Sequence, residues 1–468
     1  MPTTSYNLFG RGPTRALRDT DGGRPTGSME ELVPLSDGGA IGLFERVSST
    51  GYPDFDVIPG TDQILLQRYG PDGTATGEAV AVPADEAGLA RNALMLGLPG
   101  GGVVVAWAVR ADETGGEAGV RVRWFDAELN PLGEGARPFA ALEDGGSLAG
   151  MVLDEAAGEV VLLAEGAGDG ADLGYARLAL SDGRVTETGT IEGAGPGGRL
   201  AASVGADGAL TILLDQVSGM TVWPAGITLA DQGGRQYAPV MEALPDGGYV
   251  AGFIDQAPDN AESARIVFLD ADGTPRGDGT LLAKSDPNQV FQLPDHATRD
   301  LNIDVLPSGH VVTTHLASFT LTSGDVPVVN VFSPEGDRLL RDLVLDDVGT
   351  YFDVTTGVAD GAVTVSYYDA DARAVVARTV DVVRETRADG PAGDRLNGDG
   401  LADDIYGGTG ADTVFAGGGD DVVLAGGGDD EVDAGDGDDL VEGGEGGDLI
   451  EGGAGADVIY GDLFDGGA

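Results

Sequence analysis

The chain has 468 residues, and 79 acidic side chains against 26 Lys and Arg give it a formal charge of −53. Nucleic acids and anionic membranes carry the same sign, so this charge excludes them as natural partners and favours cations. The chain has no cysteine, which excludes disulfides and thiolate metal sites.

The N-terminal segment, residues 1–21, is polar and holds no hydrophobic run, so a cleavable export signal of the Sec type is not expected. The longest apolar run, Val103 to Val109, is far shorter than the roughly 20 residues that span a bilayer. We therefore expect a soluble protein without a membrane span.

The region upstream of residue 385 repeats a two-part pattern at a spacing of roughly 50 residues, a period typical of propellers and solenoids. The first part is a turn that leads into an apolar strand, as in Leu244-Pro-Asp-Gly-Gly-Tyr-Val-Ala-Gly-Phe253. Copies of this part begin at Leu35, Leu98, Ala157, Ala206, Leu244, Leu306 and Ala359.

The second part of the pattern is an alternating strand that ends in a hairpin turn, as in Arg265-Ile-Val-Phe-Leu-Asp-Ala-Asp-Gly273. Apolar residues at period two between Asp-Gly turns indicate short antiparallel strands rather than helices. Seven units of about four strands predict an all-β fold in which residues 1–384 form a seven-bladed β-propeller-like domain. A β-sandwich array or an irregular solenoid is the alternative.

The seventh unit lacks a fourth strand, because its strands Phe352 to Thr356, Ala362 to Tyr368 and Ala374 to Val382 are followed by polar residues. An open edge would leave backbone groups unpaired, and closed propellers commonly borrow a strand from the other end of the chain. The unassigned segment Tyr6 to Phe9 alternates suitably. We therefore predict that it pairs with Ala374 to Val382.

The composition changes abruptly near residue 385. We read 385–393 as a linker and 394–468 as a separate domain, which holds about twenty acidic residues and one base, Arg395. Its sequence divides into nonapeptides of the form Gly-Gly-x-Gly-x-Asp-x-apolar-x, as in Gly407-Gly-Thr-Gly-Ala-Asp-Thr-Val-Phe415. Units begin without a gap at Gly407, Ala416, Ala425, Ala434, Gly443 and Gly452.

This pattern resembles the RTX (haemolysin-type) family of calcium-binding repeats. The resemblance covers roughly the last 70 residues and implies a parallel β-roll, in which a glycine-rich turn and a short strand alternate and two units complete one coil. It also implies that position-six aspartates and backbone oxygens of stacked turns hold Ca²⁺. These aspartates are Asp412, Asp430 and Asp448 on one edge, and Asp421, Asp439 and Asp457 on the other.

The stacking implies roughly four sites flanked on both sides. Oxygen-only ligation suits Ca²⁺ better than Mg²⁺, which requires a tighter octahedron. The position-eight residues should point inward; they are Val414, Val423, Val432, Val441, Ile450 and Ile459. We interpret the position-five acids Asp420, Asp429 and Asp438 as solvated charge.

The segment Asp394 to Asp404 departs from the nonapeptide and resembles an EF-hand loop only weakly, with Arg395 where a first ligand would stand. We interpret it as an imperfect capping repeat, with a variant calcium site as the alternative. A disordered acidic tail is the alternative to the roll as a whole, and we expect disorder in the calcium-free state.

The sequence contains no catalytic motif. A zinc protease is excluded by the absence of His-Glu-x-x-His in a chain whose histidines are His296, His310 and His315. His310 and His315 lie in or beside an expected strand and are interpreted as structural, with a catalytic role as the alternative. The segment Gly145 to Ala149 only approximates a Gly-x-Ser-x-Gly elbow and is expected to be a loop. We therefore expect no enzyme activity, although the sequence does not decide the question.

Three further features have a structural interpretation and a functional alternative. Asp270-Ala-Asp-Gly273 is expected to be a hairpin turn rather than a metal loop. Arg276-Gly-Asp278 matches an adhesion tripeptide, which chance produces often in a chain rich in Gly and Asp. The tryptophans are expected in the propeller core rather than as carbohydrate platforms; they are Trp107, Trp124 and Trp223.

These observations indicate a secreted, non-catalytic protein whose propeller presents a ligand-binding or adhesion surface and whose roll folds on extracellular calcium. The partner would be an extracellular glycan, polymer or cell-surface ligand. A hydrolase or lyase that acts on an extracellular polymer is the first alternative, and a surface-layer or matrix component is the second. The resemblance implies type I export through an uncleaved C-terminal signal, which we do not find before Ala468.

Overall fold

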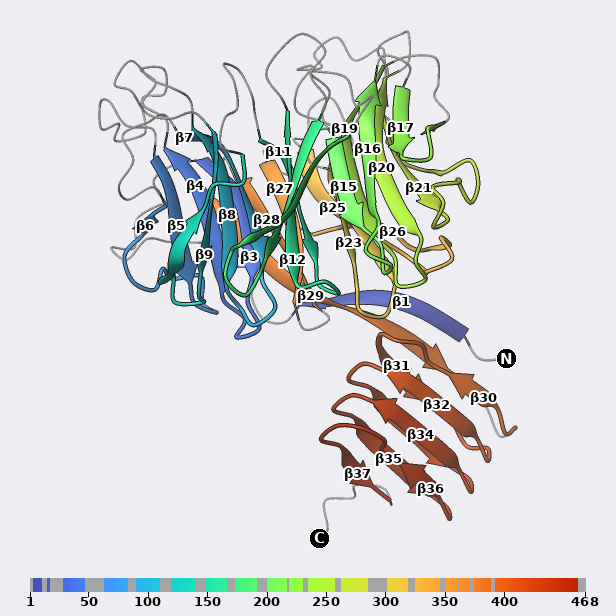
Figure 1. The fold of residues 1–468 in the computed structure, drawn as a ribbon. Helices are drawn as coiled ribbons and strands as arrows, with labels where there is room; N and C mark the ends of the chain where they lie inside the picture. The colour runs from blue at the N-terminus through green and yellow to red at the C-terminus, as the bar shows by residue number, and fades with distance from the viewer. Residues whose placement is uncertain are drawn as a thin grey trace.

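The computed structural model is all-β and consists of a propeller-like ring and a parallel β-solenoid (Figure 1). The structure describes residues 3–10, 15–16, 28–46, 63–82, 90–109, 119–139, 148–165, 173–191, 200–216, 219–229, 235–256, 262–284, 301–318, 325–345, 351–359, 362–369, 374–388 and 392–461. Among these residues, no helix has the length and hydropathy that crossing a bilayer requires.

Six separate four-stranded sheets form blades, each an antiparallel meander in chain order. The first two consist of β3 (Ser28–Pro34), β4 (Ala40–Arg46), β5 (Gln63–Tyr69) and β6 (Val80–Ala81), and of β7 (Ala90–Gly97), β8 (Val103–Val109), β9 (Gly119–Phe125) and β10 (Pro131–Ala136). The next two consist of β11 (Leu148–Asp154), β12 (Glu159–Glu165), β13 (Leu173–Ala179) and β14 (Val185–Ile191), and of β15 (Leu200–Val204), β16 (Leu210–Gln216), β17 (Gly219–Trp223) and β18 (Ile227–Thr228). The last two consist of β19 (Arg235–Ala243), β20 (Tyr249–Gln256), β21 (Glu262–Leu269) and β22 (Thr280–Lys284), and of β23 (Asn302–Val305), β24 (Val311–Ser318), β25 (Asp325–Phe332) and β26 (Arg338–Val344).

The sequence-based prediction of seven separate blades is wrong for the last unit. Strands β27 (Tyr351–Ala359), β28 (Ala362–Asp369) and β29 (Ala374–Arg387) belong to a nine-stranded sheet that continues into the solenoid. Strand β27 contacts both β23 and β3, so these strands nevertheless close the ring. The pattern missed the continuation because β29 runs past residue 384, through the first part of the expected linker.

The N-terminal segment also pairs with β29. Strand β1 (Thr3–Gly10) runs antiparallel to it, with Tyr6 opposite Arg384 and Phe9 opposite Asp381. Strand β2 (Arg15–Ala16) pairs further back, opposite Ala377 and Val376. The partner strand is the expected one, but the register places β1 several residues further along β29, towards the solenoid.

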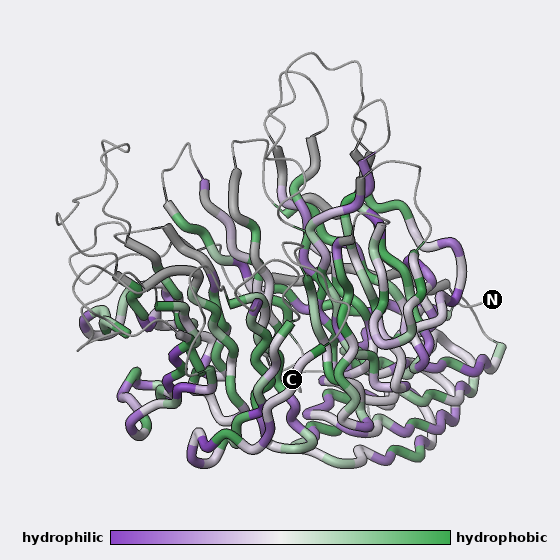
Figure 2. Tube along the Cα trace, turned by 45° about the horizontal axis from the view of Figure 1, so that its top comes forward, coloured by the Kyte–Doolittle hydropathy of each residue, from purple (hydrophilic) through white to green (hydrophobic). Residues whose placement is uncertain are grey.

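The ring is held together by apolar packing between neighbouring blades. Along β8, Val103, Val105 and Trp107 pack into a cluster with the first blade, whereas Val104 and Ala106 pack into a cluster with the third. Both faces of a central strand are therefore buried, which explains its continuous apolar sequence. In Figure 2, hydrophobic residues follow many of the strands and hydrophilic residues lie at many of the turns.

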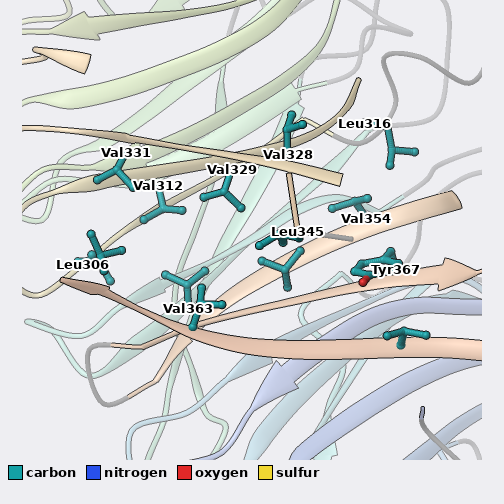
Figure 3. Packing of buried hydrophobic residues seen from close by; sticks show 14 of the residues in the cluster. Leu306, Val312, Leu316, Val328, Val329, Val331, Leu345, Val354, Val363 and Tyr367 are labelled. Atoms are coloured by element: carbon teal, nitrogen blue, oxygen red, sulfur yellow. The ribbon is translucent and has the colours of Figure 1, made fainter. Parts of the chain in front are cut away.

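The packing extends across the junction to β27–β29. Figure 3 shows Val328, Val329 and Val331 of β25 in one buried cluster with Val363 and Tyr367 of β28. Of the three tryptophans, Trp107 and Trp124 are buried as expected, and Trp223 is partly buried. The core therefore includes the incomplete seventh sheet, and ring closure does not depend on hydrogen bonds alone.

The C-terminal solenoid is a parallel β-roll with two sheets. One sheet continues from β29 through β31 (Ala402–Tyr406), β33 (Val422–Gly427), β35 (Leu440–Glu445) and β37 (Val458–Tyr460). The other consists of β30 (Arg395–Asn397), β32 (Thr413–Gly418), β34 (Glu431–Asp436) and β36 (Leu449–Glu451). Residues 18 apart stack on each other, for example Val423 on Ile405.

Candidate calcium sites and central cavity

The turns of the roll bring backbone oxygens close together because glycine occupies positions two and four. Gly426 has a φ of +106°, and a Cβ atom there would lie 2.1 Å from the carbonyl oxygen of Gly408. At position four, Gly437 has a φ of +145°, and a Cβ atom would lie 2.1 Å from the carbonyl oxygen of Gly419. Only glycine allows this stacking.

The position-six aspartates form one column at each edge of the roll. In every described pair, Oδ1 accepts a hydrogen bond from the backbone N–H of the aspartate 18 residues earlier, for example at 2.7 Å from Asp412 to Asp430 and at 2.9 Å from Asp421 to Asp439. The distance reaches 3.2 Å from Asp439 to Asp457, at the C-terminal end. This bond orients each carboxylate and leaves its second oxygen for another partner.

The second oxygen, Oδ2, is buried and accepts no hydrogen bond in five of these aspartates: Asp412, Asp421, Asp430, Asp439 and Asp448. A buried carboxylate oxygen without a partner is costly unless a cation neutralises it. Within the described chain, no three His, Asp or Glu side chains gather at one point. A cation bound here would therefore need backbone carbonyl oxygens as well, a mixed oxygen set that fits Ca²⁺.

The same burial disfavours the charged form of these carboxylates. Desolvation raises the pKa of Asp421 to about 8, with a further contribution from the neighbouring carboxylates of Asp403 and Asp439. It also raises the pKa of Asp412, Asp430 and Asp439. A bound divalent cation would oppose this effect, because it stabilises the ionised form.

The core of the roll agrees with the expected inward positions except at its end. Val414, Val423, Val432 and Val441 are buried and Ile450 is partly buried, but Ile459 is 45% exposed. Ile459 lies in the last strand that the structure describes, and no described coil stacks on its outer side. A second inward row was missed, because alanine at position one gives a weak hydrophobic signal: Ala416, Ala425 and Ala434.

The position-five acids were expected to be solvated charge, and this interpretation is incomplete. Oδ1 of Asp420 accepts from the N–H of Asp438 at 3.0 Å, and Oδ1 of Asp429 accepts from Gly447 at 2.9 Å. Oδ1 of Asp438 accepts from Ala456 at 2.7 Å. These exposed carboxylates therefore connect successive coils in the direction opposite to the position-six aspartates.

The segment Asp394 to Asp404 is part of the stack. Leu396 and Ile405 are buried in register with the position-eight residues, and Asp394 and Asp403 stand at position six. Their N–H groups donate to Asp412 and Asp421, both at 2.7 Å. The register was readable from the 18-residue spacing, but neither unit has glycine at position four, where Ala392 and Leu401 stand, and this obscured it.

The ring encloses a cavity of about 1340 Å³, lined by all seven inner strands. Its charged lining includes Glu31 of β3, Glu242 of β19 and Asp304 of β23. The backbone N–H of Met95 donates to Glu31, and Thr356 hydrogen-bonds to Asp304, whose Oδ2 is buried without a hydrogen bond. Carboxylates that line one cavity make it a candidate ligand site.

The pKa values of two of these carboxylates are raised. Burial raises the pKa of Asp304 to about 6, against the hydrogen bond from Thr356. Burial, followed by the charge of Asp304, raises the pKa of Glu242 to about 8. The ring surrounds Glu242, but the residue is exposed to the water of the cavity, which opposes this shift.

The remaining motifs have structural roles or lie elsewhere. His315 is buried in β24, and His310 is buried beside the roll. The N–H of Gly273 donates to the carbonyl of Asp270 at 2.8 Å, as in a hairpin turn, and Arg276 forms ion pairs with Asp246 and Asp270. His296 and residues 145–147 lie outside the described residues.

Comparison with known families identifies the C-terminal region. Residues 397–432 and 433–466 match the RTX calcium-binding nonapeptide repeat (4 copies). The C-terminal part of the chain therefore consists of RTX repeats, which bind calcium and are typical of secreted proteins. The predicted family resemblance and the predicted ion are confirmed. No curated protein matches the chain.

Several solved structures are similar in fold. One is a protein of unknown function from Dyadobacter fermentans DSM 18053, at 12% identity, 80% coverage of this chain, 98% of that chain and a TM-score of 0.45. Another is the polysaccharide lyase Uly1, at 9% identity, 76% and 90% coverage and a TM-score of 0.45. A third is an α-L-arabinanase from Penicillium chrysogenum, at 12% identity, 80% and 98% coverage and a TM-score of 0.43.

Proposed function

We propose that this chain is a secreted protein whose C-terminal roll folds on extracellular calcium and holds a propeller that binds an extracellular ligand. The calcium part rests on one observation. In each of five stacked aspartates, a buried carboxylate oxygen has no hydrogen-bond partner in the protein. The proposed ligands are the six position-six aspartates, together with turn carbonyls. The part up to residue 384 and the roll from residue 394 are the two functional units.

Calcium would act by removing charge repulsion. The roll holds about twenty acidic side chains on a narrow coil, and its buried carboxylates resist ionisation while they have no cation. Calcium that binds only the folded roll stabilises the folded state by about 1.4 kcal/mol per site when the free calcium concentration is ten times the dissociation constant. Several sites together would therefore convert a marginal coil into a folded one at extracellular, millimolar calcium.

The propeller would bind its ligand in the central cavity. The carboxylates of Glu31, Glu242 and Asp304 can accept hydrogen bonds, and the protonated forms of Glu242 and Asp304 can also donate them. This combination of donors and acceptors suits the hydroxyl groups of a glycan or another polyhydroxylated polymer.

A hydrolase or lyase is the second candidate, and the raised pKa of Glu242 favours it. A carboxyl group that remains protonated near neutral pH can act as a general acid. In that role Glu242 would donate a proton, and a neighbouring ionised carboxylate would act as the base or nucleophile.

A screen of glycans and surface polymers, with and without calcium, tests the propeller part of the proposal. The wild-type chain is compared with Glu242→Gln and with Glu128→Gln, a change in an exposed turn outside the cavity lining. We expect binding that Glu242→Gln weakens and Glu128→Gln does not. If Glu242→Gln leaves binding unchanged, the cavity is not the binding site. If the protein releases fragments from a polymer, it is a hydrolase or lyase rather than a binding protein.

A further inference from the structure

The turn at residues 398–403 is the first turn of its column in the roll; it lies against the propeller and differs from the later turns of that column. Strand β29 pairs in parallel with β31, with Arg384 beside Asp403 and Arg387 beside Tyr406. In this sheet, β29 therefore takes the place that a preceding coil would occupy. The column that contains Asp403, Asp421, Asp439 and Asp457 begins here.

Asp403 is the one described aspartate of this column whose two oxygens both have protein partners. Its Oδ2 accepts from the N–H of Asp399 at 3.0 Å, and its Oδ1 lies 3.3 Å from Nη1 of Arg384. In Asp421 and Asp439, by contrast, Oδ2 accepts no hydrogen bond. The Asp403 side chain is 0% exposed, so its charge depends on Arg384 rather than on solvent.

Arg384 is surrounded by oxygen atoms of the same kinds that a stacked turn offers to a cation. Its Nη1 donates to the backbone carbonyl of Asn397 and contacts the position-six carboxylate of Asp403. Its Nε lies 3.7 Å from Oδ2 of Asp399. The guanidinium group thus brings a fixed positive charge to one backbone carbonyl and two carboxylates.

We propose that Arg384 takes the place of a calcium ion at the propeller end of the roll, so that the first turn is organised by the protein and serves as the template for the calcium-dependent turns. The inference rests on the proposed calcium-dependent folding of the roll. It concerns the first turn alone, because the later position-six aspartates lack such a partner.

Asp399 supports this assignment because it stands at position two, where the six later units all have glycine. Its Oδ2 lies 3.6 Å from Nε2 of the buried His310, and a hydrogen bond of 3.1 Å joins the ring to Ser308. At the next residue, Gly400, a Cβ atom would lie 2.8 Å from that of Ser308. The turn is thus fitted closely to the 306–310 segment of the propeller.

Hydrogen exchange of the full chain tests the inference. In calcium-free buffer, we expect amides of residues 396–406 to exchange at least about tenfold more slowly than those of 420–461. Arg384→Gln should remove this difference, because it leaves the Asp403 carboxylate buried without a cation. Arg387→Gln is the matched control, since Arg387 lies on the same strand but contacts Glu385 and the Tyr406 ring instead.

The outcomes separate the two proposals. If residues 396–406 exchange as fast as 420–461 in calcium-free wild-type protein, or if Arg384→Gln and Arg387→Gln behave alike, the role of Arg384 is refuted. If calcium protects no part of 407–461 in any variant, the proposed function fails instead. Exchange within the propeller strands of the same samples shows whether each variant has folded.

Discussion

The two oxygens of each position-six aspartate have different roles in the roll. Oδ1 fixes the stacking by accepting an N–H from the previous coil, and Oδ2 has no partner within the protein in five of the six. A carboxylate at this position thus links the geometry of the backbone to the binding of a cation. Replacement by asparagine would keep the shape and remove the charge.

Asp430→Asn should weaken calcium binding more than Asp457→Asn. Asp430 is buried and has coils on both sides, whereas Asp457 is partly exposed in the last described coil. Loss of a charged, buried ligand should cost about 1.5–3 kcal/mol, or at least about tenfold in affinity. Calorimetric titration of the two full-length variants measures the difference, and equal losses would contradict the assignment.

Asp304 should make the stability of the propeller depend on pH. Its folded pKa of about 6 lies above the ordinary 3.8, so the folded state binds more protons between these values. The stabilisation by protonation is complete below about pH 4 and is lost as the pH rises through about 6.

Asp304→Asn, which imitates the protonated carboxyl, should therefore be more stable than wild type at pH 8 by about 1–2 kcal/mol and equal to it near pH 4. Thermal unfolding of the propeller at both values measures this. Asp182→Asn, in an exposed turn, is the control. The same difference at both pH values would show that the effect does not arise from titration.

At the level of strands, the sequence predicts most elements that have a turn signal at one end. The Asp-Gly turn before Tyr249 and the period of two in β21 both lead to strands of the structure. The length of β29 was not predictable from local pattern, because its last residues form a strand only by pairing with β1 and β31. Pairing between distant segments likewise determines the register of β1.

Deleting residues 1–12 should lower the melting temperature of the propeller by about 3–8 °C. The deletion removes β1 and exposes the backbone groups of residues 380–387 that pair with it. The number of calcium ions bound should not change, since β1 contains none of the position-six aspartates. Calorimetric unfolding with and without calcium measures both quantities, and an unchanged melting temperature would contradict a closing role for β1.

The candidate sites differ in how far the sequence predicts them. The two columns of position-six aspartates follow from the nine-residue period, because identical turns stack and place identical groups in line. The cavity carboxylates could not be found in this way. Glu31, Glu242 and Asp304 lie on three different blades, and only closure of the ring brings them to one space. No local motif surrounds any of them.

At the level of the whole molecule, the strand β29 joins a ring stabilised by apolar packing to a roll dominated by carboxylates. The two parts should therefore respond differently to calcium. The ring has large buried apolar clusters, so we expect it to form without calcium. The roll has a thin core of valine and alanine, and its charge opposes folding until cations bind.

Hydrogen exchange of the full chain during a calcium titration tests this account most directly. We predict that millimolar calcium protects residues 407–461 in one cooperative step, that magnesium at the same concentration does not, and that protection of the propeller strands stays the same throughout. Protection of residues 407–461 that is complete without calcium, or that never appears with it, would contradict the account.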